Sequence, residues 1–281
     1  MFLKSDLHIH TTASDGKHTP SEVVTRALET DLDVIAITDH DTVAGVDEAQ
    51  EAASGTRLRV IRGVEISTLF EGRECHLLAY AFEDAGLISE LLSNQKNRRI
   101  QRARSIISNL NRLGFDITYD EVRGEAGSAS IGRPHIARVM IKKGYASDTQ
   151  EVFFRYLGNG SSAYHKIDYP DAIKVIDKVH QARGLAVLAH PGSTYNFIEI
   201  KKLKDAGIDG IECYHPSHNS VHRRRYLTYC NNYGLIATGG SDFHGTVQSY
   251  YNFGVLHIEL QTESPLLRSA ERVENGVTET H

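Results

Sequence analysis

DLHIHTTASDG occupies residues 6–16 and is the stretch from which the rest of the chain can be placed. The residues up to Ile9 predict a short apolar strand, and side chains two positions apart in an extended chain face the same side. His8 and His10 would therefore point together, as two imidazoles do when they bind one metal ion, and Asp15 follows in a loop where a carboxylate can add a ligand. Alone, such a pair would more often be ordinary surface histidines, so the interpretation as a metal site depends on the rest of the chain.

The composition is that of an ordinary globular protein with an unusual amount of histidine. At 281 residues the chain can bury a large core, and 40% hydrophobic with 24% charged residues is typical of globular proteins. Histidine occurs 15 times, whereas tryptophan is absent. The net charge of −5 argues against a broad basic surface, and no DNA-binding surface is evident. Bound divalent cations would change the charge locally, so a phosphorylated substrate is not excluded.

The cysteines and the first ten residues indicate in which cellular compartment the protein works. Cys75, Cys213 and Cys230 form no Cys-x-x-Cys pair, and an odd number cannot all pair within one chain, which favours reduced thiols. Acidic and imidazole side chains within the first ten residues are unlike a signal peptide. No apolar run approaches the roughly 18 residues of a membrane helix. We therefore expect a soluble cytoplasmic protein without a membrane partner.

Apolar runs alternate with helical patterns along most of the chain. After the first strand, the sequence predicts strands over residues 34–38, 58–64, 77–82, 185–189, 210–213, 235–238 and 254–260, and helices over 20–29, 43–53, 171–183, 198–206 and 220–233. Strands of mostly apolar residues that alternate with helices are typical of a parallel sheet covered on both faces. The sequence therefore predicts an α/β fold.

The middle of the chain has a different pattern. A long polar helix is predicted over residues 84–113, followed by a Gly-rich stretch at 124–132 and helices over 133–143 and 149–157. We interpret residues 86–165 as a mostly helical inserted cap that interrupts the α/β part, which then comprises residues 1–85 and 166–262. Residues 263–281 are predicted to be a polar tail, partly disordered from about residue 271.

Side chains that can bind metal stand at nearly every predicted strand end. They are His8, His10, His40, Glu65, His190, His215, Asp242 and His244, with His76 at the edge of a further strand. Such ends converge on one face of a parallel α/β fold. Imidazoles and carboxylates without thiolates suit zinc, manganese or iron, and this many ligands would serve two or three ions that share bridging carboxylates, with Glu65 as the candidate bridge. Such clusters catalyse hydrolysis at phosphorus.

At these motifs the sequence resembles the PHP (polymerase and histidinol phosphatase) family of metal-dependent phosphoesterases. The matching motifs are residues 6–10, 37–41, 63–65, His76, 189–191 and 240–244. The resemblance implies a distorted seven-stranded (β/α)7 TIM-like barrel with a trinuclear centre of metal ions (Mn²⁺, Zn²⁺ or Fe²⁺/Fe³⁺). It implies that one ion takes His8, His10, Glu65 and Asp242, a second Glu65, His76 and His190, and a third Asp15, His40 and His244.

The inserted segment bears on the substrate. With residues 132–135, GRPH, it resembles the nucleotide-acting branch of the family, which includes 3′,5′-nucleoside bisphosphate phosphatases and 5′-to-3′ RNA-trimming enzymes. A phosphate needs fixed cations, and Arg133 is our first candidate, with Lys166 second. His135 and His215 could bind phosphate or protonate the leaving group, because imidazole titrates near neutral pH.

The sequence therefore predicts a phosphomonoesterase. A metal-bridging hydroxide would convert a 3′,5′-nucleoside bisphosphate into the 5′-nucleotide and phosphate. Within the same class, an RNA-trimming enzyme or a cyclic-phosphate phosphodiesterase stays open, and histidinol phosphatase ranks lower. From another class, a non-catalytic module that binds nucleotide or metal is the alternative. The chain has no Gly-x-Ser-x-Gly elbow and no phosphate-binding loop of an NTPase.

Overall fold

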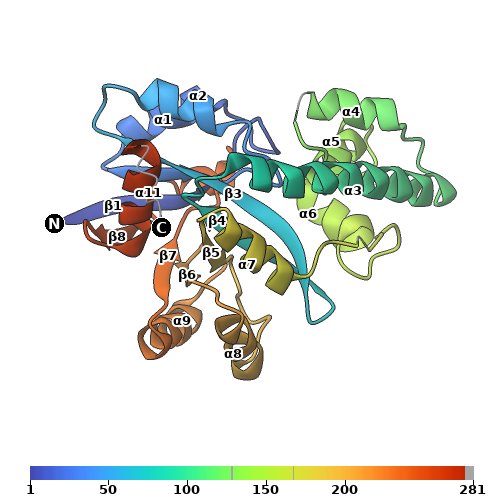
Figure 1. Ribbon diagram of the computed structural model, residues 1–281. Helices are drawn as coiled ribbons and strands as arrows, with labels where there is room; N and C mark the ends of the chain where they lie inside the picture. Colours follow the sequence, from blue (N-terminus) through green and yellow to red (C-terminus); the bar gives the residue numbers. More distant parts are fainter. Residues whose placement is uncertain (128, 167, 276–281) are drawn as a thin grey trace.

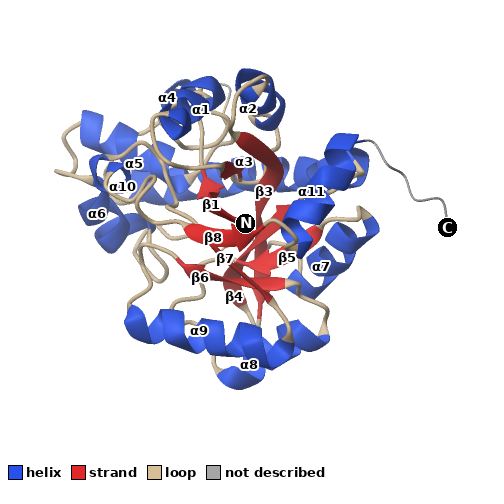
Figure 2. Ribbon diagram, turned by 90° about the vertical axis from the view of Figure 1, so that its left-hand side faces the viewer, coloured by secondary structure: helices blue, strands red, loops and turns tan. Residues whose placement is uncertain are grey.

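One sheet of eight strands forms the centre of the molecule, and helices surround it (Figure 1, Figure 2). The computed structural model describes residues 1–127, 129–166 and 168–275. The strands lie in the order β7-β6-β5-β4-β3-β2-β1-β8. Their bounds are β1 (Phe2–Ile9), β2 (Val34–Ile37), β3 (Arg59–Phe70), β4 (Arg73–Tyr80), β5 (Leu185–Leu188), β6 (Gly210–Tyr214), β7 (Ile236–Gly239) and β8 (Ile258–Gln261).

The sheet curves into a nearly closed barrel. Just beyond β7, Phe243 forms a parallel bridge with Ile9, and its carbonyl oxygen accepts a hydrogen bond of 2.9 Å from the N–H of His10. The predicted barrel-shaped α/β fold is confirmed, with one strand more than the seven that the family resemblance implied. The additional strand is β8, which pairs antiparallel with the first half of β1, from Phe2 opposite Gln261 onward.

The sheet is not wholly parallel, and this part of the prediction is wrong. The predicted strand 58–64 continues to Phe70, and β3 then pairs antiparallel with β4, as β4 does with β5. The turn between β3 and β4 consists of Glu71 and Gly72, both with positive φ (49° and 73°), as a two-residue hairpin turn requires. The hairpin places His76 within β4 and opposite Ser67.

The helices of the barrel pack apolar faces against the sheet. They are α1 (Pro20–Leu28), α2 (Val46–Ala53), α7 (Ala172–Gln181), α8 (Phe197–Asp205), α9 (Ser220–Tyr233) and the short α10 (Val247–Tyr250). In α1, Thr19 and Glu22 form a reciprocal capping box and Pro20 occupies the first turn, which explains why the helix begins there. In α7, Ala172, Val175, Ile176 and Val179 are buried at helical spacing.

The inserted segment is helical and has its own apolar cluster. It comprises α3 (Ala85–Arg112), α4 (Tyr119–Ala126), α5 (Arg133–Lys142), α6 (Thr149–Val152) and a π-helix, η1 (Phe153–Leu157). Figure 1 shows α3 leading away from the barrel, with the other helices gathered beside it. Ile106, Leu110, Ile136 and Met140 are buried in this cluster. The division of the chain into barrel and cap stays a prediction, whereas α4 was not predicted, although Thr118 and Glu121 cap its start.

The end of the described chain is ordered. Residues Pro265–Asn275 form α11, and its Leu266, Leu267 and Ala270 are buried against the barrel. The prediction of disorder is therefore wrong for residues 271–275, because an amphipathic helix covers the barrel there; residues 276–281 lie outside the described residues. Among the helices described, none is both long and apolar enough to cross a membrane.

Candidate metal centre and adjoining cavity

The two histidines of the opening motif lie at the end of β1 and are completely buried. Nε2 of His8 and Nε2 of His10 each lie 3.4 Å from Oε2 of Glu65. The same two nitrogens lie 3.5 and 3.2 Å from Oδ1 of Asp242. Asp242 reaches them because the chain passes His8 closely at Gly240, where any Cβ would overlap the His8 backbone. Two imidazoles and two carboxylates from distant parts of the chain thus meet at one point.

Glu65 is at the centre of the arrangement. Its Oε1 lies 2.7 Å from Nδ1 of His76 and 2.9 Å from Nε2 of His190, and its Oε2 lies 2.8 Å from Nδ1 of His40. Burial alone would raise the pKa of Glu65, but the imidazoles of His40, His76 and His8 outweigh burial and hold that pKa well below its usual range. Glu65 is therefore ionised and faces several imidazoles at once.

Asp15 and His244 extend the group. Oδ1 of Asp15 lies 3.2 Å from Nε2 of His244, and the rings of His244 and His10 stack with their centres 4.1 Å apart. Burial lowers the pKa of His244, but the carboxylates of Asp15 and Asp242 outweigh burial and raise it to about 10. The structure brings all nine predicted ligands together: His8, His10, Asp15, His40, Glu65, His76, His190, Asp242 and His244. We call these nine residues the ligand cluster.

Buried polar atoms without hydrogen-bond partners gather in this cluster. They include Nε2 of His8 and both ring nitrogens of His10. Nδ1 of His40 and Oε2 of Glu65 lie 2.8 Å apart but also lack hydrogen-bonding geometry. Each such atom costs roughly 1–3 kcal/mol when it stays unpaired, so their concentration at one place indicates a missing partner. The donor set therefore fits bound metal ions.

Glu212 is a buried carboxylate that the sequence analysis missed. It lies in β6; its Oε1 is 3.0 Å from Nδ1 of His8, and its Oε2 accepts the N–H of His190 at 2.7 Å. A hydrogen bond to Nδ1 turns the other nitrogen of His8 toward the cluster and fixes the ring. The only available signal was an acidic residue inside the otherwise apolar predicted strand 210–213.

Replacing Glu212 by Gln should weaken metal binding while leaving all nine ligands in place. Removing a carboxylate that orients a metal-bound histidine typically costs about 10- to 100-fold in metal affinity. Titration of the metal-free protein with Mn²⁺ measures this. Glu259→Gln, which changes an exposed carboxylate in β8, is the matched control and should bind Mn²⁺ like the wild type. Equal affinities for both variants would show that Glu212 does not orient His8.

His215 lies at the cluster with a defined ring orientation. Its Nδ1 accepts the N–H of Ser217 at 3.1 Å, and its Nε2 lies 3.3 Å from Oδ2 of Asp242. Because Nδ1 accepts a backbone hydrogen bond, the neutral ring carries its proton on Nε2. His215 therefore presents an N–H donor to the cluster.

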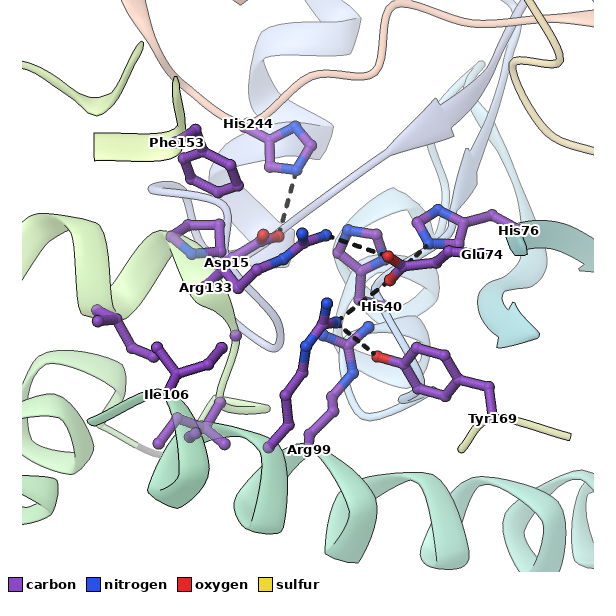
Figure 3. Close-up of a pocket in the computed structure, with 16 residues that line it drawn as sticks. Asp15, His40, Glu74, His76, Arg99, Ile106, Arg133, Phe153, Tyr169 and His244 are labelled. Carbon is purple, nitrogen blue, oxygen red and sulfur yellow. Dashed lines mark hydrogen bonds and ion pairs between the residues drawn. The ribbon is translucent and has the colours of Figure 1, made fainter. Parts of the chain in front are cut away.

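A cavity of about 210 Å³ lies between the ligand cluster and the cap (Figure 3). Asp15, His40, His76 and His244 line one part of it, and three arginines line another: Arg99, Arg102 and Arg133. Arg102 and Arg133 each contact one carboxylate oxygen of Glu74, at 3.3 and 3.4 Å. Arg99 pairs with Asp41 of the barrel and donates to Oγ of Ser67 at 2.9 Å. The cavity thus joins a cationic wall to the ligand cluster.

Two predicted substrate residues lie elsewhere. His135 is 1% exposed, and its Nδ1 accepts the N–H of Gly132 at 3.0 Å, so it caps the start of α5 and does not line the cavity. Burial lowers its pKa to about 4. Lys166 is exposed and is also outside the cavity lining. We therefore base no proposal on either residue. Arg133 lines the cavity, whereas His215 lies outside its lining but beside Asp242 of the ligand cluster.

Imidazoles and carboxylates packed this closely, beside a cavity with three arginines, suit an enzyme that hydrolyses phosphoesters with bound metal ions. Comparison with known proteins gives the same class. Residues 6–184 match the family model of the PHP domain, so the chain belongs to the PHP domain family. The resemblance seen in the sequence is confirmed, and with it the prediction of a metal-dependent phosphoesterase.

Three relatives with known activities are similar over most of their length. A 5′-3′ exoribonuclease of Haemophilus influenzae is 38% identical over 87% of this chain and 91% of its own. A phosphoribosyl 1,2-cyclic phosphate 1,2-diphosphodiesterase of Eggerthella lenta is 33% identical, with 85% and 94% covered. A 3′,5′-nucleoside bisphosphate phosphatase of Chromobacterium violaceum is 31% identical, with 85% and 86% covered. These relatives differ in the ester that they cleave.

A solved structure from Bifidobacterium adolescentis supports the fold. Its protein is described as a candidate metal-dependent phosphoesterase, and it is 32% identical to this chain. The two superpose with a TM-score of 0.81 over 86% of this chain and 89% of that one. The two chains thus share their fold over most of their length.

Proposed function

We propose that this enzyme is a phosphomonoesterase that converts a 3′,5′-nucleoside bisphosphate into the 5′-nucleotide and phosphate. The observation that carries the proposal is the composition of the cavity, where part of the ligand cluster and three arginines line the same small space. A molecule with two phosphates matches this arrangement, because the ligand cluster would bind the reacting phosphate through metal ions and the arginines would hold the anchoring phosphate.

The ligand cluster would hold two or three divalent ions, Mn²⁺, Zn²⁺ or iron. When bound, such ions lower the pKa of water to about 7 and neutralise the charge that develops on phosphoryl oxygens. Glu65 would be shared between ions, because both of its oxygens face imidazoles that reach it from several strands. Glu212 would keep His8 in its ligating orientation.

His215 would act on the reacting phosphate rather than as a metal ligand. Its Nε2–H points into the cluster beside Asp242, while its Nδ1 is occupied by the Ser217 N–H. When the ring carries a second proton, its Nδ1–H can donate to Oγ of Ser217, 2.8 Å away, and its Nε2 proton can pass to the ribose oxygen as that oxygen leaves phosphorus, which leaves the ring neutral. Arg133, from the first turn of α5, would hold the 5′-phosphate.

Comparing substrates tests the proposal. Phosphate or nucleotide release with Mn²⁺, before and after chelation, is measured as kcat/KM for adenosine 3′,5′-bisphosphate, 5′-AMP, 3′-AMP, a cyclic phosphate, histidinol phosphate and a 5′-phosphorylated RNA trimer. We expect the bisphosphate to be the best substrate, with all activity lost on chelation. If no phosphoester is cleaved in a metal-dependent way, a non-catalytic binding module becomes the better account.

A second candidate is a 5′-to-3′ exoribonuclease, because the Haemophilus influenzae relative is a 5′-3′ exoribonuclease and is 38% identical to this chain over 251 residues. Under that alternative the RNA trimer would have the highest kcat/KM in the same panel. The panel includes a cyclic phosphate because the Eggerthella lenta relative is a phosphoribosyl 1,2-cyclic phosphate 1,2-diphosphodiesterase.

Arg133→Ala should raise KM for the bisphosphate by roughly 10- to 100-fold, the worth of one charge-assisted hydrogen-bonding partner. KM for a simple aryl phosphate should change little, because that compound has no second phosphate. Arg138→Ala is the control: this residue is on the same helix but pairs with Glu125 at 3.0 Å and does not line the cavity. Equal changes for both substrates would show that Arg133 is not the anchor.

A further inference from the structure

The cavity has a third region that neither metal binding nor phosphate binding uses. Its cap side is formed by apolar side chains, which we call the apolar wall: Ala103, Ile106, Ile131, Pro134, Ile136 and Phe153. Ile106 and Ile136 belong to the buried apolar cluster of the cap and support the wall from behind. Pro134 and Phe153 are partly exposed and form the surface that a ligand can touch. A phosphate gains nothing from such neighbours, so the wall indicates that a bound molecule also has an apolar part.

Phe153 is placed by an unusual piece of backbone. It is the first residue of the π-helix η1, and π-helical turns are rare and frequently occur at functional sites. The N–H of Gly158 donates to the carbonyl oxygen of Phe153 at 2.7 Å. A Cβ at Gly158 would lie only 2.7 Å from that oxygen, so the turn requires glycine there. The two neighbouring phenylalanines differ in position: Phe153 lines the cavity, whereas Phe154 is 85% exposed.

The apolar wall directly adjoins the two charged regions. The guanidinium of Arg133 lies over the Phe153 ring, 5.6 Å from its centre, and also contacts Glu74. Figure 3 shows Phe153 beside His244 and Asp15, with Arg133 extending toward Glu74. A ligand that fills the cavity therefore touches the ligand cluster, an arginine and an aromatic ring together.

We propose that the apolar wall binds the base of a single nucleotide, packed against Phe153, and that it does so without selecting the base. This inference rests on the proposed function. A base has an apolar face and carries phosphates through its ribose, which matches the three regions. The side chains of the wall donate and accept no hydrogen bonds, so they cannot read base edges.

Substrates with and without a base test this inference. The probes are the 3′,5′-bisphosphates of adenosine, guanosine, cytidine and uridine, and ribose 3,5-bisphosphate with a methoxy group in place of the base. Stacking of a base on an aromatic ring is worth roughly 5- to 150-fold, and every base has a stacking face. We expect the wild type to prefer the four nucleosides over the abasic compound by at least about fivefold, and to cleave the four with kcat/KM values within about threefold of one another.

Phe153→Ala should lower kcat/KM for the four nucleoside bisphosphates much more than for the abasic compound, and so abolish the preference for a base. Phe153→Tyr, which keeps the ring, should retain the preference, and Phe154→Ala, its exposed neighbour, is the matched control. Phe153→Leu preserves apolar volume and replaces the Ala variant if that one fails to fold. Inhibition by 5′-AMP compared with ribose 5-phosphate gives the same comparison without turnover.

Two results would overturn the inference: a wild type that cleaves the abasic compound as well as the nucleosides, or a Phe153→Ala variant that loses activity equally on both. Selection of one base by far more than threefold would contradict binding without base selection. Failure of the proposed function itself looks different, since then no bisphosphate, with or without a base, releases phosphate.

Discussion

Replacing Glu65 by Gln should lower kcat/KM on the order of 10³-fold or more, for the bisphosphate and for an aryl phosphate alike. Glu65 is 1% exposed, and its two oxygens face the imidazoles of His40, His76 and His190 at 2.7 to 2.9 Å. The amide would remove the negative charge that these rings share and would leave only one oxygen able to bind a cation. Metal content, measured by elemental analysis, should therefore fall together with activity.

Glu83→Gln is the control for this prediction, because Glu83 pairs with Arg183 near the surface and lies outside the ligand cluster. It should retain both metal and activity. Circular dichroism checks that each variant is folded. If Glu65→Gln keeps its full metal content and its activity, the cluster does not depend on a shared carboxylate, and the proposed centre is wrong.

Replacing His215 by Gln should lower kcat for a nucleoside 3′-phosphate by about 10²- to 10⁴-fold, the usual contribution of a positioned general acid. The loss should be much smaller for an aryl phosphate with a good leaving group, because such a leaving group needs no proton. Metal content should be unchanged, since the Nε2–H of His215 faces Asp242 as a donor. Steady-state kinetics with aryl phosphates of graded leaving-group pKa measures the difference.

His257→Gln is the matched histidine control, because this residue lies in the loop before β8 and contacts the carbonyl oxygen of Val255. It should behave as the wild type with every substrate. An equal loss of kcat for good and poor leaving groups in His215→Gln would remove the general-acid role. Loss of metal in that variant would assign His215 to the ligands instead.

Most of the candidate site was predictable because its residues follow local patterns. His8 and His10 share a strand face through simple alternation, and Glu65 and His190 stand where apolar runs give way to polar residues. The carboxyl ends of the strands converge in any fold of this class. The ligands could therefore be grouped although they are scattered along 281 residues and the path of the chain between them was not known. The assignment of each ligand to a particular ion stays a prediction.

Features that depend on distant contacts were not predictable. The hairpin of β3 and β4 could be mistaken for a strand end at Glu65, because the apolar pattern does not show where a strand reverses. Glu212 looked like one acid in a strand, and only the fold brings it to His8. His135 was chosen for its chemistry, yet it is buried and caps α5, which depends on how the cap packs. In α11, the apolar side chains indicate a buried helix only when the barrel surface that they pack against is known.

Anomalous X-ray scattering from crystals grown with saturating Mn²⁺ tests the central claim most directly. We expect two or three strong anomalous peaks among the nine residues of the ligand cluster, with at least one ion in contact with Glu65. Peaks confined to other parts of the surface, or none at all, would contradict it, because the imidazoles and carboxylates would then be packed together without holding metal.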